Sequence, residues 1–209
     1  MAELRVYLRI EFLQRQFAAY MATPTRARGY IPLAGMHSLI VEMAPALAIH
    51  RVLDLAIKAV PEVEPGLLYV ERQFGILEVH AREVEDLERA GKSILDGIGA
   101  TAADQLRPQI LYIDVLESVA DQHAVILNRN RDASMILPGE ALLLVEVAPA
   151  LFAAFAANEA EKLVPELTLV DVQMIGASGR LFMSGAEALV RRAADHIPEA
   201  FRSVPGRGG

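Results

Sequence analysis

The strongest constraint on this chain is an internal duplication. When the sequence is compared with itself at an offset of 104 residues, 35–62 falls on 139–166 with 13 identities in 28 positions. The most similar stretch is LIVEMAPAL at 39–47, which becomes LLVEVAPAL at 143–151. The chain therefore contains two copies of one domain of about 100 residues, a common domain size.

Outside this block the similarity is weaker. Upstream of the block, the similarity is limited to a match of Tyr7 with Tyr112, at a slightly different offset. We expect the two copies to meet within 99–108, where neither pattern continues. We place the first domain at 1–104 and the second at 105–205, and we expect 206–209 to be a flexible tail.

Both copies have the same predicted order of secondary structure. A strand of branched apolar residues is followed by a proline at a first helical position and by a helix that ends at a second proline. Two strands joined by a glycine-bearing turn come next, and an amphipathic helix closes the copy. In the first copy these elements are predicted at 38–44, 46–60, 67–73, 76–80 and 84–98. In the second copy the first four are predicted at 141–148, 150–163, 167–174 and 180–183.

Further strand and helix material precedes each copy, at 4–22 and 109–128. The pattern as a whole predicts an α+β fold, in which each copy builds one antiparallel sheet of ferredoxin-like type. The helices are expected on one face of the sheet, and the opposite face is expected to stay open.

The composition favours burial between subunits. The chain is 53% hydrophobic, yet the longest apolar run, 141–157, is interrupted by Glu146 and Pro149, so no membrane span is predicted. The N-terminus does not read as a secretory signal, and the chain has no cysteine, so we expect a cytoplasmic protein without disulfides. The apolar excess and the alanine-rich helix at 150–163 indicate an obligate oligomer.

Several functional classes are disfavoured. A net charge of −7 argues against nucleic acid, and the short basic clusters are interpreted as solvated loops: Arg26/Arg28, Arg129/Arg131 and Arg202/Arg207. The five histidines show no metal-ligand spacing, and neither a nucleophile elbow nor a phosphate-binding motif is found. We therefore expect no enzyme activity, no cofactor and no metal. The Gly-Ala-Ser-Gly stretch at 176–179 offers backbone N–H groups to an anion, but it lacks the lysine of a phosphate loop.

The duplicated segments resemble the bacterial microcompartment shell-domain family. That family carries an acidic or amide residue four positions before a lysine in its first helix, and here these are Asp54 and Lys58, and Asn158 and Lys162. The stretch from Ile175 to Gly185 is similar to the family's pore-loop hairpin, and its candidate pore residues are Gly176, Ala177, Ser178 and Gly179. The resemblance covers about 36–100 and 140–200. Two copies in one chain are typical of the tandem subfamily, whose trimers imitate a six-fold hexamer.

The strand and helix material that precedes each copy resembles the circularly permuted tandem group, whose members form double-stacked trimers with a gated pore. Members of that group carry a Glu-Arg pair at the pore, and here YVERQFG provides Glu71-Arg72. Gly75, close behind, supplies a residue free to adopt backbone angles that others resist. We place Asp171-Val172 at the matching point of the second copy, so the pair occurs in one copy only. If the family resemblance is set aside, the alternative is that Glu71-Arg72 is an ordinary solvated pair at the end of a strand.

The resemblance implies a structural shell protein and not an enzyme. Its partners would be further copies of itself, other shell hexamers and pentamers, and metabolites that cross the pore, with no nucleic acid and no membrane. It also implies that Lys58 and Lys162 lie at the edge of the tile. The alternative role for each lysine is that of a cation near the negative end of its helix dipole. The competing functional class is a ferredoxin-like trimeric sensor that binds a small ligand at subunit clefts.

Overall fold

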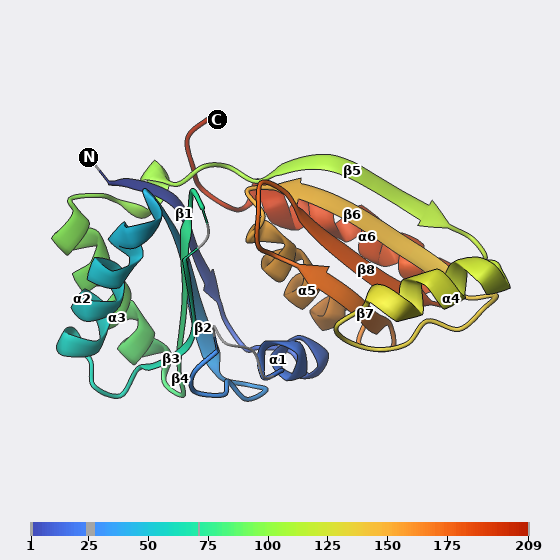
Figure 1. Cartoon of the computed structure of the whole chain (residues 1–209), viewed down its shortest axis with the longest axis horizontal. Coiled ribbons are helices and arrows are strands. Elements are labelled where there is room, and N and C mark those ends of the chain that lie inside the picture. The colour runs from blue at the N-terminus through green and yellow to red at the C-terminus, as the bar shows by residue number, and fades with distance from the viewer. Residues whose placement is uncertain (1, 24–27, 71, 209) are drawn as a thin grey trace. The chain divides into compact units, whose positions relative to one another are not determined.

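The computed structural model describes residues 2–23, 28–70 and 72–208. The chain divides into two compact units, one formed by Met1–Arg107 with Pro205–Gly209 and the other by Pro108–Val204 (Figure 1). Each unit contains one four-stranded antiparallel sheet with helices packed against it. The helices of the described part of the chain are too short or too polar to cross a membrane.

The first unit has the strand order β1-β2-β4-β3. Its strands are β1 (Glu3–Ile10), β2 (His37–Ala44), β3 (Glu64–Val70) and β4 (Gly75–Ala81). Its helices are α1 (Arg15–Met21), α2 (Ile49–Ala59) and α3 (Val84–Ile98), with short 3-10 turns at Ala46–Ala48 and Ala102–Asp104. Helices α2 and α3 lie side by side on one face of the sheet, and α1 lies on the other side (Figure 1).

The second unit repeats this plan with the strand order β5-β6-β8-β7. Its strands are β5 (Gln109–Leu116), β6 (Ala141–Ala148), β7 (Thr168–Gln173) and β8 (Gly179–Gly185). Its helices are α4 (Asp121–Asn130), α5 (Phe152–Leu163) and α6 (Glu187–Arg202). The predicted order of elements is therefore confirmed in both copies.

The core of the first unit lies between the sheet and helices α2 and α3. Alternate residues of β2 and β4 point toward the helices, as the two-residue period of a strand requires. The buried contributors include Leu39, Val41, Met43, Ile49, Val52, Leu77, Val79, Leu87 and Ile94. Removing any one of them leaves a cavity that the neighbouring side chains fill only in part.

Helix α4 covers part of the opposite sheet face in the second unit. Ala124 of α4 packs with Leu142 of β6 and Val170 of β7, and Phe182 borders this small core. The sequence pattern predicts an open face here. The cover arises because Val119 and Ile136, on either side of α4, are buried with these strands and draw the helix onto the sheet.

The prolines after β2 and β6 do not occupy a first helical position. Pro45 has extended backbone angles and precedes the 3-10 turn, and the peptide bonds Ala44-Pro45 and Ala148-Pro149 are both cis. The prediction therefore placed both prolines too far into the helix: Pro45 only precedes the 3-10 turn, and α5 begins at Phe152, three residues after Pro149. The helix ends are confirmed, because α2 and α5 stop two residues before Pro61 and Pro165.

A β-bulge occupies the same place in the first strand of each unit. The register of β1 against β2 shifts between Leu4 and Val6, and that of β5 against β6 shifts between Ile110 and Tyr112. The bulge residues are therefore Arg5 and Leu111. The expected match of Tyr7 with Tyr112 is wrong.

The strand register shows where the true match lies. Tyr7 faces Val41 and Ile113 faces Val145, so Tyr7 corresponds to Ile113. The offset differs from that of the main repeat because the connection between β5 and β6 is two residues shorter than the connection between β1 and β2.

The C-terminal residues are hydrogen-bonded to the segment before β5. The Arg107 amide donates to the Arg207 carbonyl at 3.0 Å, and the Arg207 amide donates to the Gln105 carbonyl at 2.8 Å. Gln105 in turn accepts from the Tyr7 amide through its side chain, and the Leu106 amide donates to the Arg5 carbonyl. Residues 105–107 therefore pair with the edge of β1, and Arg207 pairs with them.

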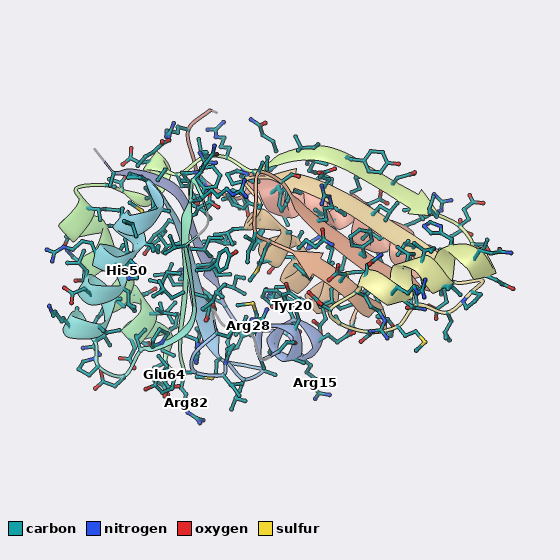
Figure 2. The ribbon with its side chains drawn as sticks, in the orientation of Figure 1. Arg15, Tyr20, Arg28, His50, Glu64 and Arg82 are labelled. Carbon is teal, nitrogen blue, oxygen red and sulfur yellow. The ribbon has the colours of Figure 1, made fainter. Side chains whose placement is uncertain are left out.

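The short basic clusters include structural ties. Arg28 donates to the Thr23 carbonyl at 2.8 Å and to the Tyr20 carbonyl, and its guanidinium carbon lies 4.9 Å from the centre of the Tyr20 ring (Figure 2). Arg131 donates to Asn128 and to the Ala133 carbonyl. The interpretation of these side chains as solvated loop residues is corrected, because the turns present carbonyl groups that a guanidinium satisfies.

Candidate pore turns and edge helices

The first candidate site is the turn between β3 and β4. Glu71 of the predicted Glu-Arg pair lies outside the described residues. Arg72 and Gln73 are exposed in this turn, and Phe74 is half-buried. The turn therefore presents a cation to solvent beside an aromatic side chain that contacts the unit.

The matching turn of the second copy lies between β7 and β8. Leu68 pairs with Leu77, and Val172 pairs with Leu181 in the same register, so the position of Arg72 corresponds to Gly176. The assignment of Asp171-Val172 as the matching pair is wrong, because both residues lie within β7. The true counterpart of the Glu-Arg pair is Ile175-Gly176, which carries no charge.

Gly75 and Gly179 end the two turns, and both are glycine because of a close approach. A Cβ atom at Gly75 would lie 2.0 Å from the Ala46 carbonyl oxygen, and one at Gly179 would lie 2.0 Å from that of Ala150. The expected role of Gly75, unusual backbone angles, is corrected. It is Gly176 that adopts a positive φ, of 122°.

Phe74 is contacted by an ion pair at the sheet face. Arg5 Nε donates to Glu42 Oε1 at 2.7 Å, and the guanidinium carbon of Arg5 lies 3.9 Å from the centre of the Phe74 ring. Glu42 is 1% exposed, and the Arg5 side chain is 19% exposed. A charge pair with so little exposure is held more firmly than one in free solvent, and the ring face adds a cation–π contact.

The second turn is held by a different set of residues. Ser178 Oγ donates to Glu146 Oε1 at 2.5 Å, and Arg180 reaches the same oxygen at 3.3 Å. Arg180 also donates to Gln173 Oε1 at 3.2 Å, which ties β8 to β7. The Ser178 hydroxyl, with Arg180, holds the pKa of the Glu146 carboxyl below its usual range.

Glu42 and Glu146 are thus equivalent anchors that use different partners. Strand register matches Arg5 with Leu111, and Ile76 with Arg180, while the turn places Ser178 where the first copy has Phe74. Each copy supplies one arginine to the glutamate, from β1 in the first and from β8 in the second. Both glutamates lie within the repeat, but neither was singled out as a site residue, and Arg5 lies upstream, where the repeat is weak.

The two candidate edge helices differ at the residue before the lysine. Lys58 Nζ lies 2.7 Å from Asp54 Oδ1 on α2, where Lys58 is exposed and Asp54 is half-buried. On α5, Asn158 is fully buried, and Lys162 instead approaches Glu159 at 3.8 Å. The structure therefore brings together Asp54 and Lys58 but not Asn158 and Lys162.

A buried polar cluster lies on the β2-β4 face of the first unit. Ser38 Oγ donates to Glu78 Oε1 at 2.6 Å, and His80 Nδ1 lies 3.3 Å from Glu78 Oε2. A Cβ at Gly66 would overlap the Glu78 carboxylate, so a larger residue there would require this side chain to shift. Among the described residues, His, Asp and Glu side chains form no group of three suited to a metal ion.

A duplicated, permuted four-stranded sheet, with a hairpin turn at equivalent points of both copies, defines a tandem microcompartment shell protein. The family model described as the CsoS1D N-terminal domain matches residues 4–104. Carboxysome shell protein CsoS1D of Hydrogenovibrio crunogenus (strain DSM 25203 / XCL-2) is 39% identical over 208 residues, which cover 99% of this chain and 100% of that protein. The chain belongs to this family of carboxysome shell proteins.

Further comparisons agree. Carboxysome shell protein CcmP of Synechococcus elongatus (strain ATCC 33912 / PCC 7942 / FACHB-805) is 38% identical over 205 residues, covering 98% of this chain and 94% of CcmP. The solved structure of the double ringed trimeric shell protein MSM0271 from the RMM microcompartment matches with a TM-score of 0.96 and 57% identity over the full length of both chains. The fused permuted hexameric shell protein MSM0275 matches with a TM-score of 0.92 and 43% identity, covering 98% and 99% of the two chains.

The family assignment decides between the functional classes. The relatives are structural shell proteins, so this chain is a structural protein of a bacterial microcompartment shell, within the cytoplasm, and not an enzyme. The alternative of a trimeric small-molecule sensor is not supported. The resemblance noted from the sequence, including the permuted tandem arrangement, is confirmed.

Proposed function

We propose that three copies of the chain close into a pseudohexameric tile whose central pore is lined by the two hairpin turns. A pseudohexamer needs six equivalent domains, and three chains of two matched units supply them. The trimeric state of MSM0271, which has the same fold throughout, supports this assembly. In the tile, the turn at 71–75 would alternate around the axis with the turn at 176–179.

The gate is assigned to the first of these turns. The observation that carries this assignment is that Arg72 is exposed in the first turn, while its counterpart in the second is Gly176. A trimer would therefore present three Glu71-Arg72 pairs and three uncharged turns. Ion pairs in contact with water are worth only about 0–1 kcal/mol each, so a ring of them forms a latch that opens readily.

The gate would pass metabolites between the two sides of the shell. With the Arg72 side chains turned inward the opening is filled, and with the turns swung outward it would admit a phosphorylated or cofactor-sized molecule. The double ringed state of MSM0271 supports a second proposal, that two tiles stack face to face. Stacked tiles with separate gates would enclose a chamber between them.

The edge of the tile is assigned to α2 and to the end of α5. Lys58 is exposed in the last turn of α2, with Asp54 holding its ammonium group, so it is available to a neighbouring tile. Lys162 occupies the same place on α5 and is half exposed. The neighbours would be other copies of this tile and the hexameric and pentameric proteins of the same shell.

The experiment that tests the gate is a permeability measurement on assembled shells. Replacing Glu71 and Arg72 together by alanine should leave trimers intact and raise the rate at which a phosphorylated probe reaches an encapsulated enzyme. Arg82→Ala is the matched control, because Arg82 is an exposed arginine at the other end of β4 (Figure 2). Equal permeability in the double variant and the parent would contradict the assignment.

A further inference from the structure

Phe74, in the first turn, has its ring in contact with Arg5 of β1. Phe74 directly precedes Gly75, where β4 begins, and Gly75 is packed so closely against the Ala46 carbonyl that no side chain fits there. Phe74 is therefore hinged to a rigid point on one side and connected to Arg72 on the other. Whatever binds the Phe74 ring also limits where the turn can go.

Arg5 is placed by the bulge in β1 to bind that ring. A bulge adds a residue that the partner strand does not match, and it redirects the side chain at that point. At this bulge, Arg5 binds Glu42 at 2.7 Å through Nε and lies 3.9 Å from the Phe74 ring centre. Glu42 is almost completely buried, so the glutamate holds Arg5 while the outer face of the guanidinium is left to the ring.

The second copy provides an independent observation. There the equivalent glutamate, Glu146, binds Ser178, which stands where Phe74 stands in the first copy. The residues around the two glutamates differ at three equivalent positions, Arg5/Leu111, Ile76/Arg180 and Phe74/Ser178. In both copies, however, the glutamate or its arginine still contacts the residue before the glycine that ends the turn. The direct hydroxyl bond to Ser178 makes a firm tie, and the ring contact in the first copy makes a weaker one.

We propose that Arg5, oriented by Glu42, is a positioning residue that clamps Phe74 and thereby sets the conformation of the gate turn. With Arg5 over the ring the turn has one conformation, and when the ring leaves Arg5 the turn is free to swing about Gly75. The inference deepens the proposed pore function and rests on it. It also assigns unequal roles to the two turns: the second is fixed by Glu146, and the first is released from its clamp at small cost.

The test uses a distance measurement between the three subunits of a trimer. Because the chain contains no cysteine, Gln73→Cys gives a single labelling site in the turn, and paired spin labels report the separations across the axis. In the otherwise unchanged protein we expect one dominant distance. Phe74→Leu, which keeps the Arg5–Glu42 pair and removes only the ring, should lower the ratio of this population to the others about threefold or more.

Arg5→Gln should shift the populations in the same direction as Phe74→Leu. Arg5→Gln also leaves Glu42 buried without its cation, which can prevent folding. In that case Phe74→Leu is the variant that decides the test. Arg9→Gln is the matched control: Arg9 lies on the same strand and pairs with Glu88 at 2.7 Å, but in an exposed place away from the turn. It should leave the distance distribution unchanged.

The failure of the clamp and the failure of the pore are distinguishable. An unchanged distribution in Phe74→Leu would overturn the clamp, even with the labels close together around one axis. Labels too far apart to line one opening in the parent protein would overturn the pore. In that case the mobility of the label at position 73 still tests the clamp, because Phe74→Leu must then increase it relative to Arg9→Gln.

Discussion

Glu42 and Glu146 occupy the same position in the two copies, yet each binds an arginine from a different strand. Arg5 approaches Glu42 from the bulge of β1, and Arg180 approaches Glu146 from β8. The glutamate is thus retained while its cation has moved, which indicates that both sheets need a carboxylate anchor beside the hairpin turn. The exchange also gives the two turns different strengths of attachment.

The anchor of the second turn should be visible in a titration. The pKa of Glu146 is lowered, first by the Ser178 hydroxyl and then by Arg180. Its stabilising effect is therefore present above the ordinary glutamate pKa and is lost as the pH falls through the lower, folded-state value. Ser178→Ala should raise the pKa of Glu146 toward its usual range, as measured by NMR of the side-chain carboxyl. Ser203→Ala, which removes a hydroxyl that bonds only the Ala200 carbonyl in this structure, should leave it unchanged.

Asp171 should make the opposite contribution to stability. Burial raises the pKa of its carboxyl, although hydrogen bonds from Gln173 and from the Asp132 amide act against the shift. A raised folded-state pKa means that stability falls as the pH rises through it, because the folded chain disfavours the charged form. Asp171→Asn should therefore raise Tm at neutral pH, and the gain should shrink in acid. A Tm difference that is independent of pH would contradict this reading.

The glycines that end the turns should not tolerate a methyl group. Gly75→Ala and Gly179→Ala each place a Cβ against a backbone carbonyl, and overpacking of this kind costs about 1–3 kcal/mol or more. Chemical denaturation should show this loss of stability in both variants. Gly208→Ala has no neighbour within 4 Å and serves as the control. A tolerated Gly75→Ala would mean that the start of β4 is not the fixed point of the turn.

The edge lysine should matter for assembly and not for folding. Lys58→Ala removes one exposed ion pair, so the unfolding free energy should change by less than about 1 kcal/mol. Incorporation into shells, measured in competition with the parent protein, should fall clearly. Lys92→Ala is the matched control, since Lys92 forms the same kind of exposed pair with Asp96 one turn away on α3. Equal losses in the two variants would place the tile edge elsewhere.

Much of the fold could be predicted from the sequence because the duplication presents each strand and helix pattern twice. The strands and helices of one copy are supported by those of the other, and the paired prolines fix where α2 and α5 end. The bulges at Arg5 and Leu111 carry no such signal, because a register shift depends on the partner strand. The match between Tyr7 and Tyr112 failed for a different reason: the connection between β5 and β6 is two residues shorter than the one between β1 and β2, so the first strands match at another offset.

The candidate site was only partly predictable. Lys58, Arg72 and the 176–179 turn were assigned because their residue types stand at family positions, and their roles stay predictions. The role of Gly75 was misread, because its constraint comes from the Ala46 carbonyl across space and not from its own backbone angles. Arg5 was missed because a cation–π contact between the first strand and a turn almost 70 residues later leaves no local pattern.

The central claim, a closed trimer built from duplicated domains, is tested most directly by native mass spectrometry of the purified chain. Three chains of 22.8 kDa give a species of about 68 kDa, and two stacked tiles give about 137 kDa. We predict that no smaller stable species is found at concentrations where the tile is intact. A stable monomer, or a smallest assembly of six chains that does not divide into threes, would contradict the account.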